Sequence, residues 1–289
     1  MKIFFLILLI LVAAATVALW FWRQADHSAD HAAMARLAAL QPDSPKRFDP
    51  SLIESLPEPA RRYFRYTIQP GTPLYTVARI SMTGKFGMGN REAPDYLDMQ
   101  ATQMLAMPEG FIWKMSASRG ALRISGSDTE QWTRFWLMGL LPVARMGGDP
   151  DHARSAFGRY VAEAVFWTPA ALLPGPGIAW ELVDVNTARV TVRHKGVEQA
   201  VDVVVADDGR PLQVSFDRWS NANPEKVYRW QRFGGYLSEF RVFAGFVLPT
   251  RVEAGNFFGS EAYFPFFVAE ISHVEFPEAN AKDRADSCP

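Results

Sequence analysis

The chain has 289 residues, of which 48% are hydrophobic and 21% are charged, a composition typical of a globular protein with an ample core. Its 30 basic and 31 acidic residues give a net charge of −1, so the composition predicts no nucleic-acid partner and no general attraction for anionic lipid. The single cysteine, Cys288, excludes an intrachain disulfide.

The chain begins with an uninterrupted run of apolar or small residues with one threonine, residues 3–22. As a helix this run is long enough to cross about 30 Å of hydrocarbon. Aromatic residues at 20–22 suit the membrane interface and favour a retained single-pass anchor. A cleavable signal peptide stays open, because Ala13 and Ala15 offer a cleavage site. The run predicts a single-pass membrane protein whose C-terminal part is exported, to the periplasm or the cell exterior.

The residues that follow the apolar run, 24–50, are predicted to form a helical stalk and linker. Residues 28–40 are rich in Ala and Leu and predict a short helix, whereas 41–50 contain prolines typical of a linker. His27 and His31 are four residues apart, a spacing that can bind zinc from one helix face. No third ligand follows at a recognisable spacing, so a solvated helix face is favoured and no metal is predicted.

Beyond a helix expected within 55–75, the sequence from 74 to 127 alternates with a period of two and predicts an antiparallel meander. Methionines and aromatic residues are concentrated there. Such residues fill irregular cores, and they also line adaptable apolar binding surfaces. Both interpretations stay open for Met99, Met104, Phe111, Trp113 and Met115.

Two helices are predicted next. Residues 130–146, with Trp132 and Trp136, are too apolar for a free surface and are interpreted as a short buried or membrane-facing helix. From Asp149 to Trp167, apolar residues recur at steps of three and four, which indicates one apolar stripe of a helix that ends before Pro169.

Arg159 and Glu163 are spaced i, i+4 on the second of these helices and can pair across one turn. A structural ion pair is favoured over general acid–base chemistry by Glu163, because no second carboxylate or histidine lies at a suggestive distance.

The chain after Ile178 is almost entirely strand-like. Asp208-Gly209 and Gly234-Gly235 are interpreted as hairpin turns. The sequence contains no hydrolase, zinc-protease, redox or dinucleotide fingerprint. These observations give modest support to a protein that is not an enzyme and that uses no cofactor.

Three phrases carry a resemblance: LPEPARRYFRYTIQPGTPL, GRYVAEAVFWTPAALLPGPGIAWELVD and LPTRVEAGNFFGSEAYFPFFVAEI. With them, residues 55–276 resemble a family of uncharacterised bacterial membrane-anchored proteins labelled only as a domain of unknown function. The order of meander, helix and second meander more distantly resembles the LolA and LppX lipoprotein-carrier fold. That resemblance implies a strongly curved antiparallel sheet that wraps helices around a cavity for acyl chains.

The resulting prediction is an α+β protein with a curved, half-barrel, largely antiparallel sheet covered by a few helices and preceded by a transmembrane helix. Residues 51–277 form a single domain, and 278–289 form a disordered tail. The expected function is non-covalent binding of a lipid or other apolar ligand. An envelope scaffold with a filled core and an enzyme that uses Glu163 and Arg159 are the alternatives. The predicted ligand-binding residues are Met99, Met104, Phe111, Trp113, Met115, Trp132, Trp136, Phe166 and Trp167.

Overall fold

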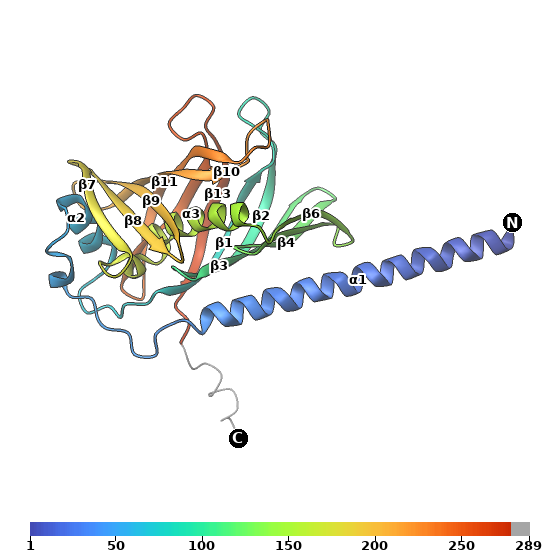
Figure 1. Cartoon of the computed structure of the whole chain (residues 1–289), viewed down its shortest axis with the longest axis horizontal. Coiled ribbons are helices and arrows are strands. Elements are labelled where there is room, and N and C mark those ends of the chain that lie inside the picture. Colours follow the sequence, from blue (N-terminus) through green and yellow to red (C-terminus); the bar gives the residue numbers. More distant parts are fainter. Residues whose placement is uncertain (279–289) are drawn as a thin grey trace, which may run out of the picture.

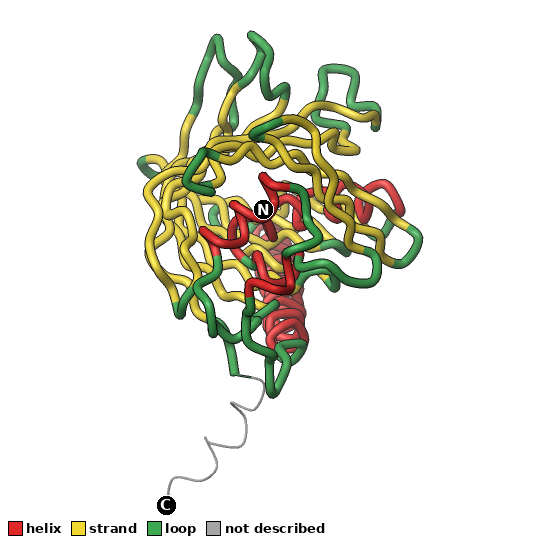
Figure 2. The backbone as a smooth tube through the Cα atoms, turned by 90° about the vertical axis from the view of Figure 1, so that its left-hand side faces the viewer, coloured by secondary structure: helices red, strands yellow, loops and turns green. Residues whose placement is uncertain are grey.

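The body of the molecule is one antiparallel sheet of thirteen strands, seen here in a computed structural model that describes residues 1–278. The strand order is β6-β5-β4-β3-β2-β1-β13-β12-β11-β10-β9-β8-β7. The strands form an open arch around helical segments (Figure 2). The predicted fold class, an α+β protein with a strongly curved antiparallel sheet, is therefore confirmed.

The strands fall into two meanders. The first contains β1 Val77–Gly87, β2 Tyr96–Ala106, β3 Gly110–Arg119, β4 Leu122–Thr129, β5 Trp132–Leu137 and β6 Leu141–Gly147. The second contains β7 Ile178–Asp184, β8 Thr187–His194, β9 Val197–Val205, β10 Pro211–Ser220, β11 Arg229–Phe243, β12 Phe246–Asn256 and β13 Phe264–Glu275. The helical elements are α1 Lys2–Ala38, η1 Pro50–Ile53, α2 Glu58–Thr67, α3 Pro150–Trp167 and η2 Pro169–Leu172.

The two meanders join at the centre of the sheet. The first runs outward from β1 to the edge strand β6, and the second runs inward from the other edge strand, β7, to β13. Antiparallel pairing of β1 with β13 closes the sheet across the join. Helix α3 connects the two edges through the space that the sheet encloses (Figure 1). The two halves consequently share one core.

Helix α3 is the centre of that core. It begins at Asp149, whose side chain accepts a hydrogen bond from the backbone nitrogen of His152 at 2.8 Å, and Pro150 occupies the first turn. From Ala156 to Trp167 every residue except Arg159 is buried. The single apolar stripe predicted from the sequence is therefore too narrow a description, because protein surrounds this half of the helix.

Helix α2 covers one end of the arch. The Tyr63 hydroxyl donates a hydrogen bond of 2.5 Å to the carbonyl oxygen of Val165, near the end of α3. Tyr63 and Phe64 both pack against Trp180, with ring centroids 5.5 and 5.3 Å apart. Burial of these rings ties the segment before the sheet to the C-terminal end of α3.

Helix α1 is one continuous helix, so the separate helix predicted at 28–40 is the second half of a longer one. Its N-terminal half projects away from the domain (Figure 1). Its C-terminal half buries Asp26, Asp30, Ala33 and Leu37, whose spacing places them on one face. The segment predicted as a stalk is thus helical to Ala38, and its buried face packs on the domain. The predicted tail and Cys288 lie, from residue 279 on, outside the described residues.

The helix predicted at 130–146 is wrong. The segment forms the hairpin of β5 and β6, with a turn at Met138 and Gly139, where φ is +52° and +72°. Both faces of this edge hairpin carry strongly apolar residues: one face packs on the domain, and the other is exposed. A segment that is apolar on both faces has the same sequence pattern as a buried helix. The sequence pattern could not distinguish these two cases.

The turn predicted at Gly234-Gly235 is also wrong, because both glycines lie inside β11. The hairpin turns instead at Ala244 and Gly245, where φ is +48° and +91°. A Cβ at Gly235 would meet the backbone oxygen of Glu253 at 2.0 Å, so glycine permits the close approach of β12. The turn predicted at Asp208-Gly209 is confirmed, with φ of +94° at Gly209.

Candidate ligand cavity

A cavity of about 260 Å³ lies between α3 and the concave face of the sheet. Its walls come from α3, from β1, β3, β4 and β5 of the first meander, and from β10 to β13 of the second. The apolar part of the lining is dominated by aromatic rings: Phe86, Trp113, Phe135, Phe166, Trp167, Phe216, Phe233, Phe266 and Phe267. A concave, mostly apolar space with a few polar groups is the usual form of a small-molecule site.

Part of the polar lining is an ion-pair network around Arg159. Its guanidinium donates to Glu163 and to Asp128, each at 2.7 Å, and lies 4.6 Å from the centroid of Phe111. Glu163 also accepts a short hydrogen bond from Gln103. Burial opposes the charge of Arg159, but the two carboxylates outweigh it and raise the pKa of this guanidinium. Both carboxylate oxygens of Glu163 accept hydrogen bonds, so the geometry suits a structural ion pair that joins α3 to the sheet.

Arg218, on β10, is one of the lining residues that the sequence did not reveal. Its side chain is partly exposed and lies 5.2 Å from the centroid of Phe233. Desolvation, together with the positive charge of Arg159, lowers its pKa to about 10. Its Nε is buried and has no hydrogen-bond partner among residues 1–278. Alternation along β10 could have placed Arg218 on the face of Val214 and Phe216, but only the fold shows that this face is the cavity wall.

Two further buried donors belong to the lining. Nε1 of Trp113 and Nε1 of Trp167 have no hydrogen-bond partner within the described part of the chain. An unsatisfied buried donor costs about 1–3 kcal/mol. All three nitrogens are buried, so they belong to residues of the lining without opening onto the cavity space.

The structure divides the nine predicted ligand residues between the two faces of the sheet. Trp113, Phe166 and Trp167 line the cavity. Met99, Phe111 and Met115 belong to the same apolar core without lining the cavity.

The other three predicted residues lie on the outer face of the sheet, away from this cavity. Met104 and Trp132 pack in a separate cluster with Leu37 of α1, and Trp136 bonds to Asp26 of α1. Side chains alternate between faces along a strand, so Gln103 points inward and its neighbour Met104 points outward.

A family model describes residues 46–269, most of the chain and all of the cavity lining. Its description is a family of unknown function, DUF6544. The chain belongs to this family. A search of the curated proteins finds no match.

Two solved structures are similar to this DUF6544 member. One, from Vibrio parahaemolyticus, is described as an outer membrane lipoprotein-sorting protein domain; it is 10% identical, with a TM-score of 0.36, and the match covers 72% of this chain and 88% of that one. The other is a LolA superfamily protein from Nitrosomonas europaea, 11% identical, with a TM-score of 0.37 and coverage of 75% and 91%. Likeness at this level says nothing about ligands or activity.

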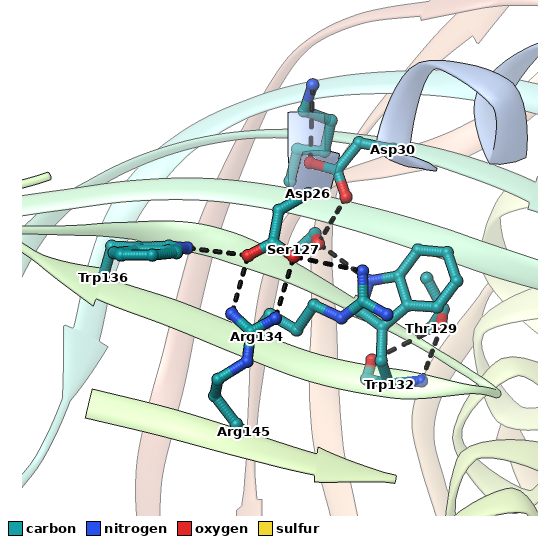
Figure 3. A network of polar contacts seen from close by, with 9 residues as sticks. Asp26, Asp30, Ser127, Thr129, Trp132, Arg134, Trp136 and Arg145 are labelled. Carbon is teal, nitrogen blue, oxygen red and sulfur yellow. Dashed lines mark hydrogen bonds and ion pairs between the residues drawn. The ribbon is translucent and has the colours of Figure 1, made fainter. Parts of the chain in front are cut away.

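The outer face of the sheet holds α1 through a polar network (Figure 3). Arg145 donates two hydrogen bonds to Asp26, at 2.6 and 2.8 Å, and Trp136 donates a third at 2.9 Å. Arg134 approaches the same carboxylate at 3.3 Å. Although burial raises the pKa of Asp26, its partners, Arg145 first, lower it below its ordinary value of 3.8. The carboxylate is therefore charged in the docked helix.

One turn further along α1, Asp30 accepts a 2.6 Å hydrogen bond from Ser127 and lies 3.7 Å from Lys114. Asp26 and Asp30 are buried, whereas His31 is exposed, so only part of this helix face is solvated. His27 accepts a hydrogen bond from Arg23, and residues 1–278 contain no cluster of three or more potential metal ligands. A hollow of about 450 Å³ beside this network is lined mainly by polar side chains, including members of the network itself.

Proposed function

We propose that this protein is a membrane-anchored, exported module that binds a lipid or other apolar ligand in the cavity between α3 and the sheet. The observation that carries the proposal is the aromatic lining of this cavity, with the guanidinium of Arg218 beside it. The walls favour an acyl chain or another apolar body, and the positive charge of Arg218 favours a carboxylate or phosphate group on the same molecule.

The volume of the cavity limits the size of the ligand. About 260 Å³ lies slightly below the range of roughly 300–1,000 Å³ typical of small-molecule pockets. A single acyl chain or a small apolar molecule suits this space better than a complete phospholipid. An open cavity also favours ligand binding over the alternative of a scaffold whose core is filled by its own side chains.

The proposed anchor is the apolar half of α1. Helix α1 is long and apolar enough to cross a membrane, with a mean hydropathy of 2.9 over its most apolar window, and none of that window is buried in the protein. We place the helix in the bacterial inner membrane as a single pass. Extraction of membranes with carbonate should leave the full chain in the pellet, and mass spectrometry of the mature protein should show residues 1–22 retained. Release into the soluble fraction, or a mature chain that lacks this segment, would contradict the anchor.

The binding site is tested by photo-crosslinking in membranes that contain the full chain. A fatty acid that carries a diazirine near the end of its acyl chain should label peptides from the cavity wall, around Trp113, Phe216 and Phe267. Peptide mapping by mass spectrometry locates the crosslinks. Labels confined to residues 3–22 would mean that the probe reports bulk lipid alone, and the binding proposal would fail.

A matched pair of variants separates cavity binding from surface adhesion. Ala254→Phe places a ring in the cavity, whereas Ser272→Phe places the same ring on an exposed position of β13. Crosslinking to the cavity peptides should be lost in the first variant and kept in the second. Circular dichroism of both variants shows whether the fold is retained, and unchanged labelling in a folded Ala254→Phe variant would contradict the site.

A further inference from the structure

The hairpin of β5 and β6 ends in an exposed apolar patch, which we call the tip patch: Met138, Leu140, Leu141 and Val143. These side chains are 53%, 52%, 56% and 53% exposed. Residues 131–148 contain no acidic residue, and their only charges are Arg134 and Arg145. Four neighbouring large apolar side chains at the edge of a sheet are costly in water and suit a lipid or protein interface.

A hydrogen bond fixes the position of the tip patch along α1. Arg23 donates a 2.6 Å hydrogen bond to the carbonyl oxygen of Gly139, at the turn of the hairpin. Arg23 is also the first residue after the apolar run 3–22. At 1.5 Å per residue this run is about 30 Å long, which equals the thickness of the hydrocarbon core. An anchor that spans the membrane therefore brings the turn to the membrane surface.

The contacts around the turn fix this arrangement. The indole of Trp22 packs edge-on against Trp136, with centroids 5.8 Å apart, and Arg145 lies 4.4 Å from the centroid of Trp22. Arg145 is also bonded to Asp26, so the hairpin and the helix are joined on both sides of Arg23. Tryptophan and arginine are residues that suit the interface between headgroups and acyl chains.

We propose that the tip patch inserts into the interfacial layer of the same bilayer that α1 crosses. The domain would then contact the membrane at two points, the helix and the hairpin, and would hold one orientation relative to the lipid surface. The proposal rests on the anchor proposed above and adds a second, separate contact. The continuity of the tip patch with the apolar run selects lipid as the occupant in preference to a protein partner.

The test places an environment-sensitive fluorophore at single cysteines in the full chain, reconstituted into phosphatidylethanolamine–phosphatidylglycerol vesicles. All variants carry Cys288→Ser. Leu140→Cys probes the tip patch, Val12→Cys probes the anchor, and Val185→Cys is a control at a residue that is 78% exposed in the turn between β7 and β8. Quenching by spin-labelled lipid is compared with quenching by aqueous iodide at each position.

The proposal predicts that labels at positions 140 and 12 are quenched by spin-labelled lipid and shielded from iodide, with the opposite result at position 185. A water-exposed label at 140 combined with a lipid-shielded label at 12 would overturn the hairpin contact and leave the anchor intact. Water exposure at both positions would overturn the anchor itself. Shielding at 140 that disappears when the protein is diluted in excess lipid would indicate a contact between proteins and would also overturn the proposal.

Discussion

The two faces of the sheet each hold a helix, but they do so by different chemistry. On the concave face, α3 is surrounded by apolar side chains, and its one ion-pair network is enclosed with it. On the outer face, α1 is held mainly by Asp26 and Asp30 and by a small apolar cluster around Leu37. Helix α3 is part of the core, whereas α1 is attached to the surface by contacts that the loss of a charge can weaken.

The largest expected effect comes from truncating a buried side chain on the concave side of the sheet. Trp167 is completely buried on α3, so Trp167→Ala should lower the free energy of unfolding by about 3–5 kcal/mol through lost burial and a new cavity. Chemical denaturation followed by circular dichroism measures this loss. Leu37→Ala is the matched change on the outer face; it should loosen α1 and leave the unfolding of the sheet domain nearly unchanged. Equal losses of global stability would contradict the contrast between the faces.

The next effect comes from removing the charge that holds α1. Asp26→Asn leaves Arg145 and Arg134 without their anionic partner, and both arginines are about one quarter exposed, which reduces the cost. We expect docking of α1 to weaken by about 1–3 kcal/mol, with faster amide exchange in residues 26–38. Gln24→Ala, at an exposed position of the same helix, should leave exchange unchanged. Unaltered protection in Asp26→Asn would show that apolar contacts alone hold the helix.

A smaller effect is expected at the polar part of the cavity. Arg218→Gln keeps a donor but removes the charge, so an acidic ligand such as a fatty acid should bind about tenfold more weakly. Competition with the photo-crosslinking probe measures the change. Arg232→Gln is a control at a β11 arginine that bonds instead to Asp202 and Ser215. Equal affinities for the Arg218 variant and the wild type would show that the ligand's polar group lies elsewhere.

The smallest effect is a response to acid at the outer face. The folded-state pKa of Asp26 is depressed below 3.8, so its contribution to docking is present above that value and is lost as the pH falls through the folded-state pKa. Amide exchange in residues 26–38 should therefore increase below pH 3.8 before the sheet domain unfolds. In Asp26→Asn this step should be absent, and its persistence there would assign the transition to another group.

Much of the fold could be predicted from the sequence because it depends on local patterns. The length of the apolar run 3–22, the period-two segments and the turn at Asp208-Gly209 are all local features, and the structure shows the expected helix, strands and turn. The failures at 130–146 and at Gly234-Gly235 have one cause. Apolar residues and glycines have several structural uses, and the neighbouring strand decides which use applies.

The cavity was predictable only in part. Trp113, Phe166 and Trp167 line it, whereas Trp132 and Trp136 lie on the other side of the sheet. Alternation groups Arg218 with Val214 and Phe216 but does not show that this group faces the cavity. Alternation sorts the residues of one strand into two sets, but it does not say which set faces inward. That choice depends on the curvature of the whole sheet and on where α3 and α1 pack.

The sequence by itself determined the apolar segment, the strand-rich halves and the helix between them, because hydrophobic periodicity and turn chemistry act over a few residues. Only the tertiary structure decided that β1 pairs with β13, that α3 is enclosed, that α1 docks through Asp26, and that the β5–β6 turn lies beside Arg23. The physical reason is distance along the chain. Arg23 and Gly139 are 116 positions apart, and such contacts form only when the complete sheet brings the segments together.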